Sequence, residues 1–205
     1  MRIIIVDYGA GNIRSVERAV SHSGYEATIS SDPQAVDAAD VVIVPGVGAA
    51  ADTMRNLRER SLVEPIRAFV DRGRPYLGIC MGLQALLTAS EEGGEHPCLD
   101  ILPGRVLRLP GGLKVPHMGW NNVRRRRPHP VFEGVPDDAY FYFVHSYFPV
   151  PDDGESVIGE TEYGVVFASA LARDNVVATQ FHPEKSGDVG LHFYRNFLEW
   201  AAGRR

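Results

Sequence analysis

The sequence predicts an α/β fold, a three-layer sandwich whose central sheet is mixed, mostly parallel, and flanked by helices. Short apolar runs alternate with helix-length segments through the first half of the chain. Strands that are apolar throughout and joined by helical crossovers are typical of a parallel sheet covered on both faces. The second half carries Pro, Gly and short β-rich runs, which predict antiparallel additions to that sheet.

The first half supplies the parallel part of the sheet. Its first strand is expected over 2–7, where an apolar run precedes a carboxylate and is too short for a signal peptide or a membrane span. Further strands are expected over 26–30, 41–44 and 75–79, and helices over 12–23, over two stretches within 50–72, and over 81–89.

The second half is expected to add strands and one closing helix. The helix covers about 187–202, where Val189, Phe193, Phe197 and Trp200 recur at helical spacing. The β-rich runs lie over 105–109, 120–123, 140–144, 156–160, 165–171 and 176–181. Because no repeat, low-complexity tract or linker interrupts the pattern, a single domain over 1–205 is expected.

Composition limits the partners that this chain can have. It has 205 residues, 44% of them hydrophobic, and a formal net charge of −5. An acidic chain of this kind argues against binding to nucleic acid or to an anionic membrane. The two cysteines, Cys80 and Cys98, form neither a disulfide framework nor a zinc spacing, so a reducing, cytoplasmic setting is expected.

Cys80 lies where a buried strand is expected to turn at once into a helix. It is the centre of a Gly-x-Cys-x-Gly segment at 78–82, and glycine tolerates strained dihedral angles and close backbone approach. The N-terminus of the new helix favours the thiolate. Ligands of such sheets bind at the carboxyl ends of strands, which is where Cys80 lies. A lone cysteine at a strand end is more often a small core residue, and this alternative stays open.

A cysteine nucleophile needs a base, and His182 is the best candidate among seven histidines. It ends the strand expected over 176–181 and is followed by Pro183 and Glu184. Proline keeps the segment extended, so that Glu184 can reach one ring nitrogen while the other faces the thiol. A His-Pro-Glu segment taken alone is usually only a turn.

A glycine-rich turn follows the strand expected over 41–44. In this Pro-Gly-Val-Gly segment at 45–48, the backbone N–H groups near Val47 can bind a developing oxyanion together with the amide of Met81. Glycine on both sides of Val47 also suggests that these peptides reorient, so that the oxyanion hole is complete only when a partner is ligated.

Together these motifs resemble the class I (triad) glutamine amidotransferases. The segment at 78–84 matches the nucleophile motif of that family, and the segment at 180–184 matches its His-x-Glu motif. Further segments are similar to the glutaminase subunits of imidazole glycerol phosphate synthase, and they lie at 7–13, 45–48, 116–121, 142–147 and 161–164. The resemblance covers nearly the whole chain.

The resemblance implies a mechanism and a set of site residues. Cys80 would attack the carboxamide carbon of L-glutamine, His182 would protonate the leaving ammonia and then activate water, and Glu184 would orient His182. Backbone donors at Val47 and Met81 would hold the oxyanion, and no metal or organic cofactor is needed. The implied substrate contacts are Gly48, Gln84, Ser146 and Tyr147.

The resemblance also implies a partner, the (β/α)8-barrel cyclase subunit HisF, in a heterodimer. That subunit uses the ammonia to convert PRFAR into imidazole glycerol phosphate and AICAR. Ammonia made in open water is protonated and loses its nucleophilicity, so production beside the consumer is advantageous. The candidate interface or signalling residues are Asn12, Tyr142, His145 and Lys185. Capping of a helix by Asn12 and core packing by Tyr142 remain alternatives.

Other interpretations stay open at this point. A cysteine peptidase or a stress protein on a related α/β sheet shares the strand–Cys–helix turn, and a degenerate subunit would bind the cyclase without chemistry. Another glutamine-dependent synthase, such as the one that makes anthranilate, is the nearest alternative. His117 and His145 are expected to be packed histidines, and the four consecutive arginines at 124–127 are expected in a solvated loop rather than at an RNA or phosphate site.

Overall fold

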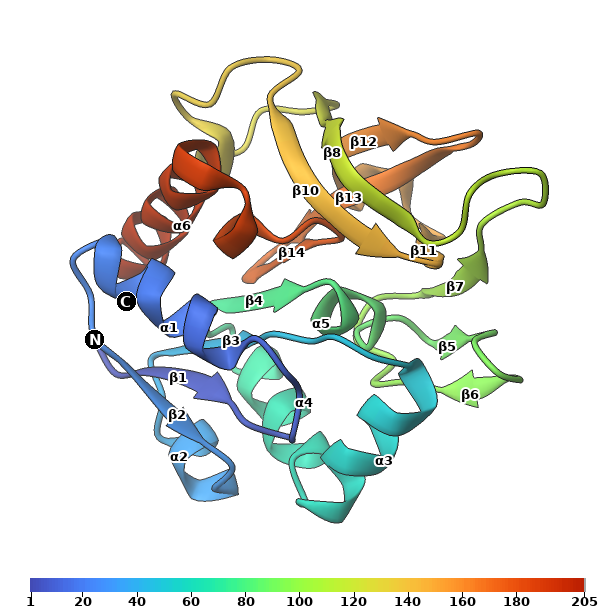
Figure 1. Ribbon diagram of the computed structural model, residues 1–205. Helices are drawn as coiled ribbons and strands as arrows, with labels where there is room; N and C mark the ends of the chain where they lie inside the picture. The colour runs from blue at the N-terminus through green and yellow to red at the C-terminus, as the bar shows by residue number, and fades with distance from the viewer. Residues whose placement is uncertain (205) are drawn as a thin grey trace.

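An eight-stranded sheet runs through the middle of the computed structural model, which describes residues 1–204 (Figure 1). Its strand order is β2-β1-β3-β4-β14-β13-β12-β9. The first five strands in this order are parallel, and the last three pair antiparallel. The prediction of a mixed, mostly parallel α/β sheet with antiparallel additions is confirmed.

The strands of this sheet are β1 (Ile3–Val6), β2 (Ala27–Ser30), β3 (Val41–Val44), β4 (Tyr76–Ile79), β9 (Arg124–Arg125), β12 (Val157–Glu162), β13 (Val166–Arg173) and β14 (Val176–Thr179). The helices are α1 (Ile13–His22), α2 (Pro33–Asp37), α3 (Ala50–Glu59), α4 (Val63–Asp71), α5 (Met81–Gln84) and α6 (Gly187–Ala202), with short 3-10 turns at Pro130–Phe132, Gly154–Ser156 and Pro183–Lys185.

The parallel strands bury both of their faces. Successive side chains of a strand point to opposite faces, so Ile3 and Ile5 of β1 belong to one hydrophobic cluster and Ile4 and Val6 to another. The first cluster includes the apolar faces of α1 and α6, and the second includes those of α2, α3 and α4. Figure 1 shows these two groups of helices on opposite sides of the sheet. This arrangement accounts for strands that are apolar at every position.

Several β-rich runs of the second half form sheets of their own. β10 (Tyr140–His145) pairs with β8 (His117–Asn122) in a two-stranded ribbon. The other separate sheet has four strands: β11 (Tyr147–Pro151), β7 (Gly104–Arg108), β5 (Ala89–Ser90) and β6 (His96–Pro97). The prediction that all of these runs extend the central sheet is wrong for these segments, because a β-rich pattern does not specify which strand it pairs with.

The helix after Cys80 is also shorter than predicted. α5 ends at Gln84 rather than continuing to residue 89. The carbonyls of Ala85, Leu86 and Leu87 accept hydrogen bonds from the backbone amides of residues 99–102 instead of from a further helical turn. A distant loop therefore ends this helix, and the local apolar pattern contains no sign of it.

Candidate active site

Cys80 occupies the sharp turn between β4 and α5. Its backbone has φ 53° and ψ −101°, a conformation that is strained for a residue with a side chain. Such a turn places the thiol at the carboxyl end of β4 and beside the N-terminus of α5. The residue is only 4% exposed, so the sulfur is largely shielded from bulk water.

The two glycines beside Cys80 allow the turn to pack closely. A Cβ atom on Gly82 would overlap the carbonyl oxygen of Val44 on the neighbouring strand β3. A Cβ atom on Gly78 would approach the carbonyl oxygen of Gly82 to 2.6 Å. Both positions therefore require glycine because backbone, which cannot move aside easily, occupies the space.

His182 reaches the same edge of the sheet from the adjacent strand. β14 pairs in parallel with β4, with Thr179 opposite Ile79, so the chain leaves both strands on the same side. The Nδ1 atom of His182 lies 2.7 Å from Oε1 of Glu184, and both side chains are buried. The other ring nitrogen, Nε2, has no hydrogen-bond partner among residues 1–204. One ring nitrogen is thus oriented by the carboxylate, and the other is free.

The electrostatic surroundings favour a proton on His182. Burial by itself lowers the pKa of this imidazole, but the nearby Cys80 and Glu184 outweigh burial and raise the pKa to about 10. Cys80 and His182 follow adjacent parallel strands, so the sulfur belongs to the surroundings of the imidazole. A histidine that keeps its proton beside a sulfur favours the thiolate, which is the nucleophilic form of cysteine.

Glu184 has a second partner that the sequence did not indicate. Nδ2 of Asn12 donates to Oε1 of Glu184 at 2.5 Å, although the two residues are 172 positions apart. Asn12 precedes α1 with φ 72° and makes no capping hydrogen bond with its side chain. The predicted capping alternative is therefore wrong, and the side chain predicted to face a partner is instead bound to the candidate triad.

A cavity of about 370 Å³ opens beside Cys80. It brings together the residues predicted for the oxyanion and for substrate contact, which are Val47, Gly48, Met81, Gln84, Ser146 and Tyr147. In the Pro-Gly-Val-Gly turn beside this cavity, the two glycines differ in the space that surrounds them. A Cβ atom on Gly46 would overlap Met81 and Tyr8, whereas one on Gly48 would meet no atom within 4 Å. The peptides on both sides of Val47 are predicted to reorient, but close packing prevents this at Gly46.

Sequence reasoning missed Glu92, which also lines this cavity. Its Oε2 atom accepts a hydrogen bond of 2.6 Å from the backbone amide of Ala50, at the start of α3. Partial burial raises the pKa of this carboxyl group. Glu92 lies in a loop between elements, where neither a motif nor a periodic pattern marked it.

The model of the glutamine amidotransferase class-I family matches residues 4–200 of this sequence. The chain belongs to this family. It is 51% identical over 201 residues to "Imidazole glycerol phosphate synthase subunit HisH" of Dehalococcoides mccartyi (strain CBDB1), covering 98% of each chain. It is 53% identical over 197 residues to the protein of that name from Moorella thermoacetica, covering 96% of this chain and 94% of the relative.

Solved structures share this fold. A glutamine amidotransferase with 26% sequence identity superposes with a TM-score of 0.73, covering 97% of this chain and 98% of that one. PurLQS from Thermotoga maritima superposes with a TM-score of 0.75 at 18% identity, again covering 97% and 98%. No helix within residues 1–204 is both long enough and apolar enough to cross a membrane.

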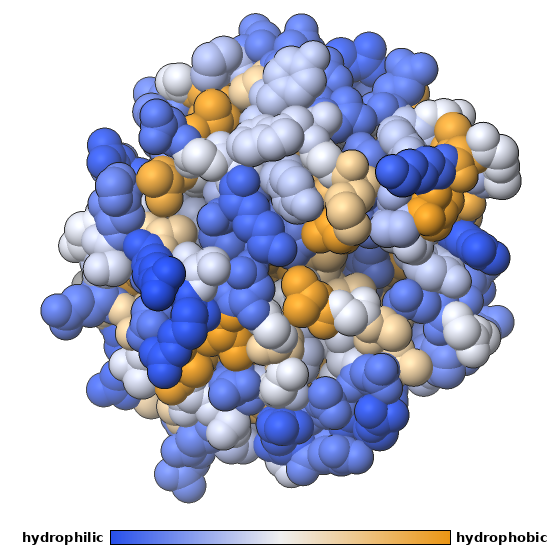
Figure 2. Space-filling model, in the orientation of Figure 1, coloured by the Kyte–Doolittle hydropathy of each residue, from blue (hydrophilic) through white to orange (hydrophobic). Residues whose placement is uncertain are grey.

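The β8–β10 ribbon of this amidotransferase has an exposed aromatic face. Met118 and Trp120 are 60% and 56% exposed, and Trp120 meets Tyr142 edge to face with ring centroids 6.2 Å apart. Nζ of Lys185 lies 5.8 Å from the centroid of the Tyr142 ring. In the view shared by Figures 1 and 2, the surface above the centre, where this ribbon lies, is pale and has intermediate hydropathy.

His145 points to the opposite, buried side of the ribbon. Its Nδ1 donates to the carbonyl of Tyr147 at 2.9 Å, and its Nε2 accepts from Nδ1 of His117 at 2.9 Å. Burial lowers the pKa of His117 to about 4 and that of His145 to about 3, so both are neutral at pH 7. They are packed histidines, as predicted. The role of His145 as an interface or signalling residue stays a prediction, and its exposed fraction of 5% leaves it little surface for direct contact with a partner.

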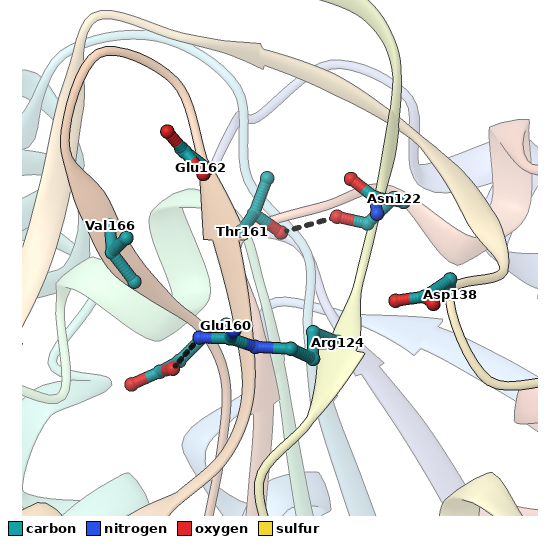
Figure 3. Close-up of a pocket in the computed structure, with 7 residues that line it drawn as sticks. All are labelled: Asn122, Arg124, Asp138, Glu160, Thr161, Glu162 and Val166. Atoms are coloured by element: carbon teal, nitrogen blue, oxygen red, sulfur yellow. Dashed lines mark hydrogen bonds and ion pairs between the residues drawn. The ribbon is translucent and has the colours of Figure 1, made fainter.

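The four arginines of the run at 124–127 are all held in ion pairs, although two of them share one carboxylate. Arg124 lines a cavity of about 150 Å³. Figure 3 shows Arg124 reaching Glu160 there, and the Thr161 hydroxyl donating to the carbonyl of Asn122. Each arginine is paired with a carboxylate: Arg124 and Arg126 with Glu160, Arg125 with Asp137, and Arg127 with Glu155. An incoming phosphate would compete with these pairs, so the arrangement disfavours a phosphate or RNA site.

Proposed function

We propose that this amidotransferase is the glutaminase subunit of an imidazole glycerol phosphate synthase and acts in histidine biosynthesis. The observation that carries the proposal is the buried His182–Glu184 pair, which follows the strand adjacent to that of Cys80, while Cys80 itself lines a substrate-sized cavity. Full-length relatives that share about half of its residues carry that name. As a biosynthetic enzyme with two free cysteines, the chain is assigned to the cytoplasm.

Hydrolysis proceeds by acyl transfer through Cys80. The thiolate attacks the carboxamide carbon of L-glutamine, and backbone N–H groups near Val47 and Met81 stabilise the resulting oxyanion. His182 gives its proton to the departing nitrogen, so that ammonia leaves and a thioester of Cys80 remains. His182 then takes a proton from water, whose oxygen attacks the thioester and releases glutamate. Glu184 orients the imidazole and stabilises its charged form throughout.

The far side of the cavity suits the amino-acid end of glutamine. Glu92 supplies a carboxylate for the α-ammonium group. The Oε1 atom of Gln84 is buried without a hydrogen-bond partner in residues 1–204, so it is available to accept from a bound substrate. Backbone groups at Gly48, Ser146 and Tyr147 complete the binding site in this proposal.

The exposed face of the β8–β10 ribbon is the proposed contact for the cyclase subunit HisF. Aromatic residues and methionine are enriched at the core of protein interfaces. Val144 and Lys185 line the active-site cavity, and Lys185 also lies against Tyr142 of the ribbon. A partner docked on this face would therefore cover the mouth of the cavity and receive ammonia before water protonates it.

The test is to measure glutamate release from L-glutamine by the chain alone, with cyclase, and with cyclase plus its nucleotide ligand. We expect activity with the cyclase, stimulation by the ligand if the oxyanion turn is completed on binding, and loss of activity in Cys80→Ala. A peptide substrate serves as the control for a peptidase. Absence of glutamate under all three conditions, or cleavage of the peptide, would overturn the proposal.

A further inference from the structure

Gln180 is a fully buried amide next to the nucleophile. It follows β14 directly, and its backbone N–H donates to the carbonyl of Ser169 at 2.9 Å, which fixes the main chain at this point. Its Nε2 atom donates to the sulfur of Cys80 at 3.4 Å. A buried primary amide needs partners for both of its ends, and here one partner is the reacting atom.

The direction of this hydrogen bond follows from a chain of amides that starts at a backbone carbonyl. Nε2 of Gln84 donates both to the carbonyl oxygen of Tyr147 and to Oε1 of Gln180, at 2.9 Å each. A carbonyl can only accept, so the amide of Gln84 must present its nitrogen to these two oxygens. Oε1 of Gln180 is then occupied, and its nitrogen must face the sulfur.

The Tyr147 carbonyl, at which this series of amide hydrogen bonds starts, has no free lone pair. The Tyr147 carbonyl also accepts from Nδ1 of His145 at 2.9 Å, so both of its lone pairs are used. Reversing the amide of Gln180 would place its oxygen against the sulfur and its nitrogen against the nitrogen of Gln84. Both contacts would be unfavourable, which leaves one orientation.

The two polar neighbours of the sulfur suit different protonation states. The carbonyl of Val144 lies 3.9 Å from Sγ and can only accept, so it interacts with the neutral thiol. The amide of Gln180 is a donor, so it interacts best with the thiolate, and hydrogen bonds to an ionised group are the stronger kind.

We propose that Gln180 is a further catalytic residue, which donates a hydrogen bond to the Cys80 sulfur and stabilises the thiolate, while Gln84 holds the amide of Gln180 in the donating orientation. This inference rests on the proposed function, since it assigns a role in the same acyl transfer. It gives Gln84 a positioning role in addition to its proposed contact with the substrate.

The test is alkylation of Cys80 by iodoacetamide as a function of pH, which reports the thiolate without using glutamine. All proteins carry Cys98→Ala, although burial already raises the pKa of the Cys98 thiol to about 11. Gln180→Met keeps the length of the side chain and removes the donor. We expect the pH midpoint of alkylation to rise by about one unit.

Two further variants separate this role from a general packing effect. Thr161→Val removes a different buried hydrogen bond, between the hydroxyl groups of Thr161 and Ser169 on adjacent strands, and should leave the midpoint unchanged. Gln84→Met frees the amide of Gln180 and should raise the midpoint by less than Gln180→Met does. A folded Gln180→Met protein with an unshifted midpoint would overturn the inference. If Gln180→Met does not fold, the alkylation midpoint of Gln84→Met is the test instead. An unshifted midpoint in Gln84→Met would then overturn the inference.

The outcome is independent of the glutaminase assay. Wild-type protein that hydrolyses no glutamine with its cyclase, yet shows the shift in alkylation, contradicts only the proposed function. Wild-type protein that hydrolyses glutamine while Gln180→Met alkylates like wild type contradicts only the role of Gln180.

Discussion

The side chain of Glu184 is fully buried, and a buried carboxylate is costly unless its charge is paired and hydrogen-bonded. His182 and Asn12 both approach its Oε1 atom. The first contact belongs to the expected triad, and the second joins the start of α1 to the end of β14. The position of the imidazole therefore depends on a residue that is remote from it in the sequence.

Asn12→Ala should lower kcat for glutamine hydrolysis about tenfold and leave KM within about twofold, because a charged hydrogen bond of about 1.5 kcal/mol is lost where the transition state forms. The measurement is steady-state glutamate release in the presence of the cyclase. Arg14→Ala is the matched control, since Arg14 lies in the first turn of α1 close to Asn12 and pairs with Glu17 at the surface. Equal kcat values for the two variants would contradict this role of Asn12.

Glu184→Gln should weaken the folded protein in a pH-dependent way. The pKa of His182 is raised in the folded state to about 10, so the stability that comes from its protonated form is fully present below its ordinary value of 6.5 and is lost as pH rises toward 10. The difference in unfolding free energy between wild type and variant should therefore shrink from pH 6.5 to 10. Urea titrations across this range measure it, and a difference that grows with pH would rule the explanation out.

At the scale of elements, the turn from β4 into α5 positions the nucleophile, and its glycines are set by packing against β3. Gly82→Ala should destabilise the protein by about 2 kcal/mol or more, because the new methyl group meets the Val44 carbonyl. Gly154→Ala, where no atom lies within 4 Å, should change stability by less than about 0.5 kcal/mol. Urea denaturation of both variants gives the comparison, and similar losses of stability would contradict the packing argument.

The same elements show what a sequence can predict. Cys80 and His182 could be assigned to one edge because both follow apolar strands, and parallel strands end together. The shortening of α5 could not be predicted, because the backbone amides that donate to the carbonyls after α5 lie beyond residue 98. α2 was missed although Asp32 and Pro33 carry a helix-start signal, with the Asp32 side chain accepting from the amide of Gln34.

The site residues that escaped prediction share a physical reason. Glu92 and Gln180 meet their partners only after distant segments pack, and Gln180 was visible only as part of a motif. The exposed position of Trp120 likewise depends on which face of the β8–β10 ribbon packs inward. A period of two predicts that the faces differ, but the pairing of the ribbon determines which one is buried.

For the whole molecule, the exposed face of the ribbon is where a second protein can influence the cavity. Trp120→Ala should weaken binding to the cyclase more than tenfold, since a large exposed aromatic residue at the centre of an interface contributes about 2 kcal/mol or more. Isothermal titration calorimetry measures the effect. Arg72→Ala, at the end of α4 on the other side of the central sheet, should bind like wild type. If Trp120→Ala binds the cyclase with unchanged affinity, the interface lies elsewhere.

The pairing of β9 with β12 makes β9 an edge strand of the central sheet, and this affects how readily the protein aggregates. An open sheet margin with unsatisfied amides and carbonyls can recruit a strand from another molecule. Here that margin is only two residues long, and both of them are arginines, Arg124 and Arg125. An edge strand this short and this polar offers few backbone groups with which a strand of another molecule can pair. The paired guanidinium groups therefore protect this enzyme against self-association along its outermost strand.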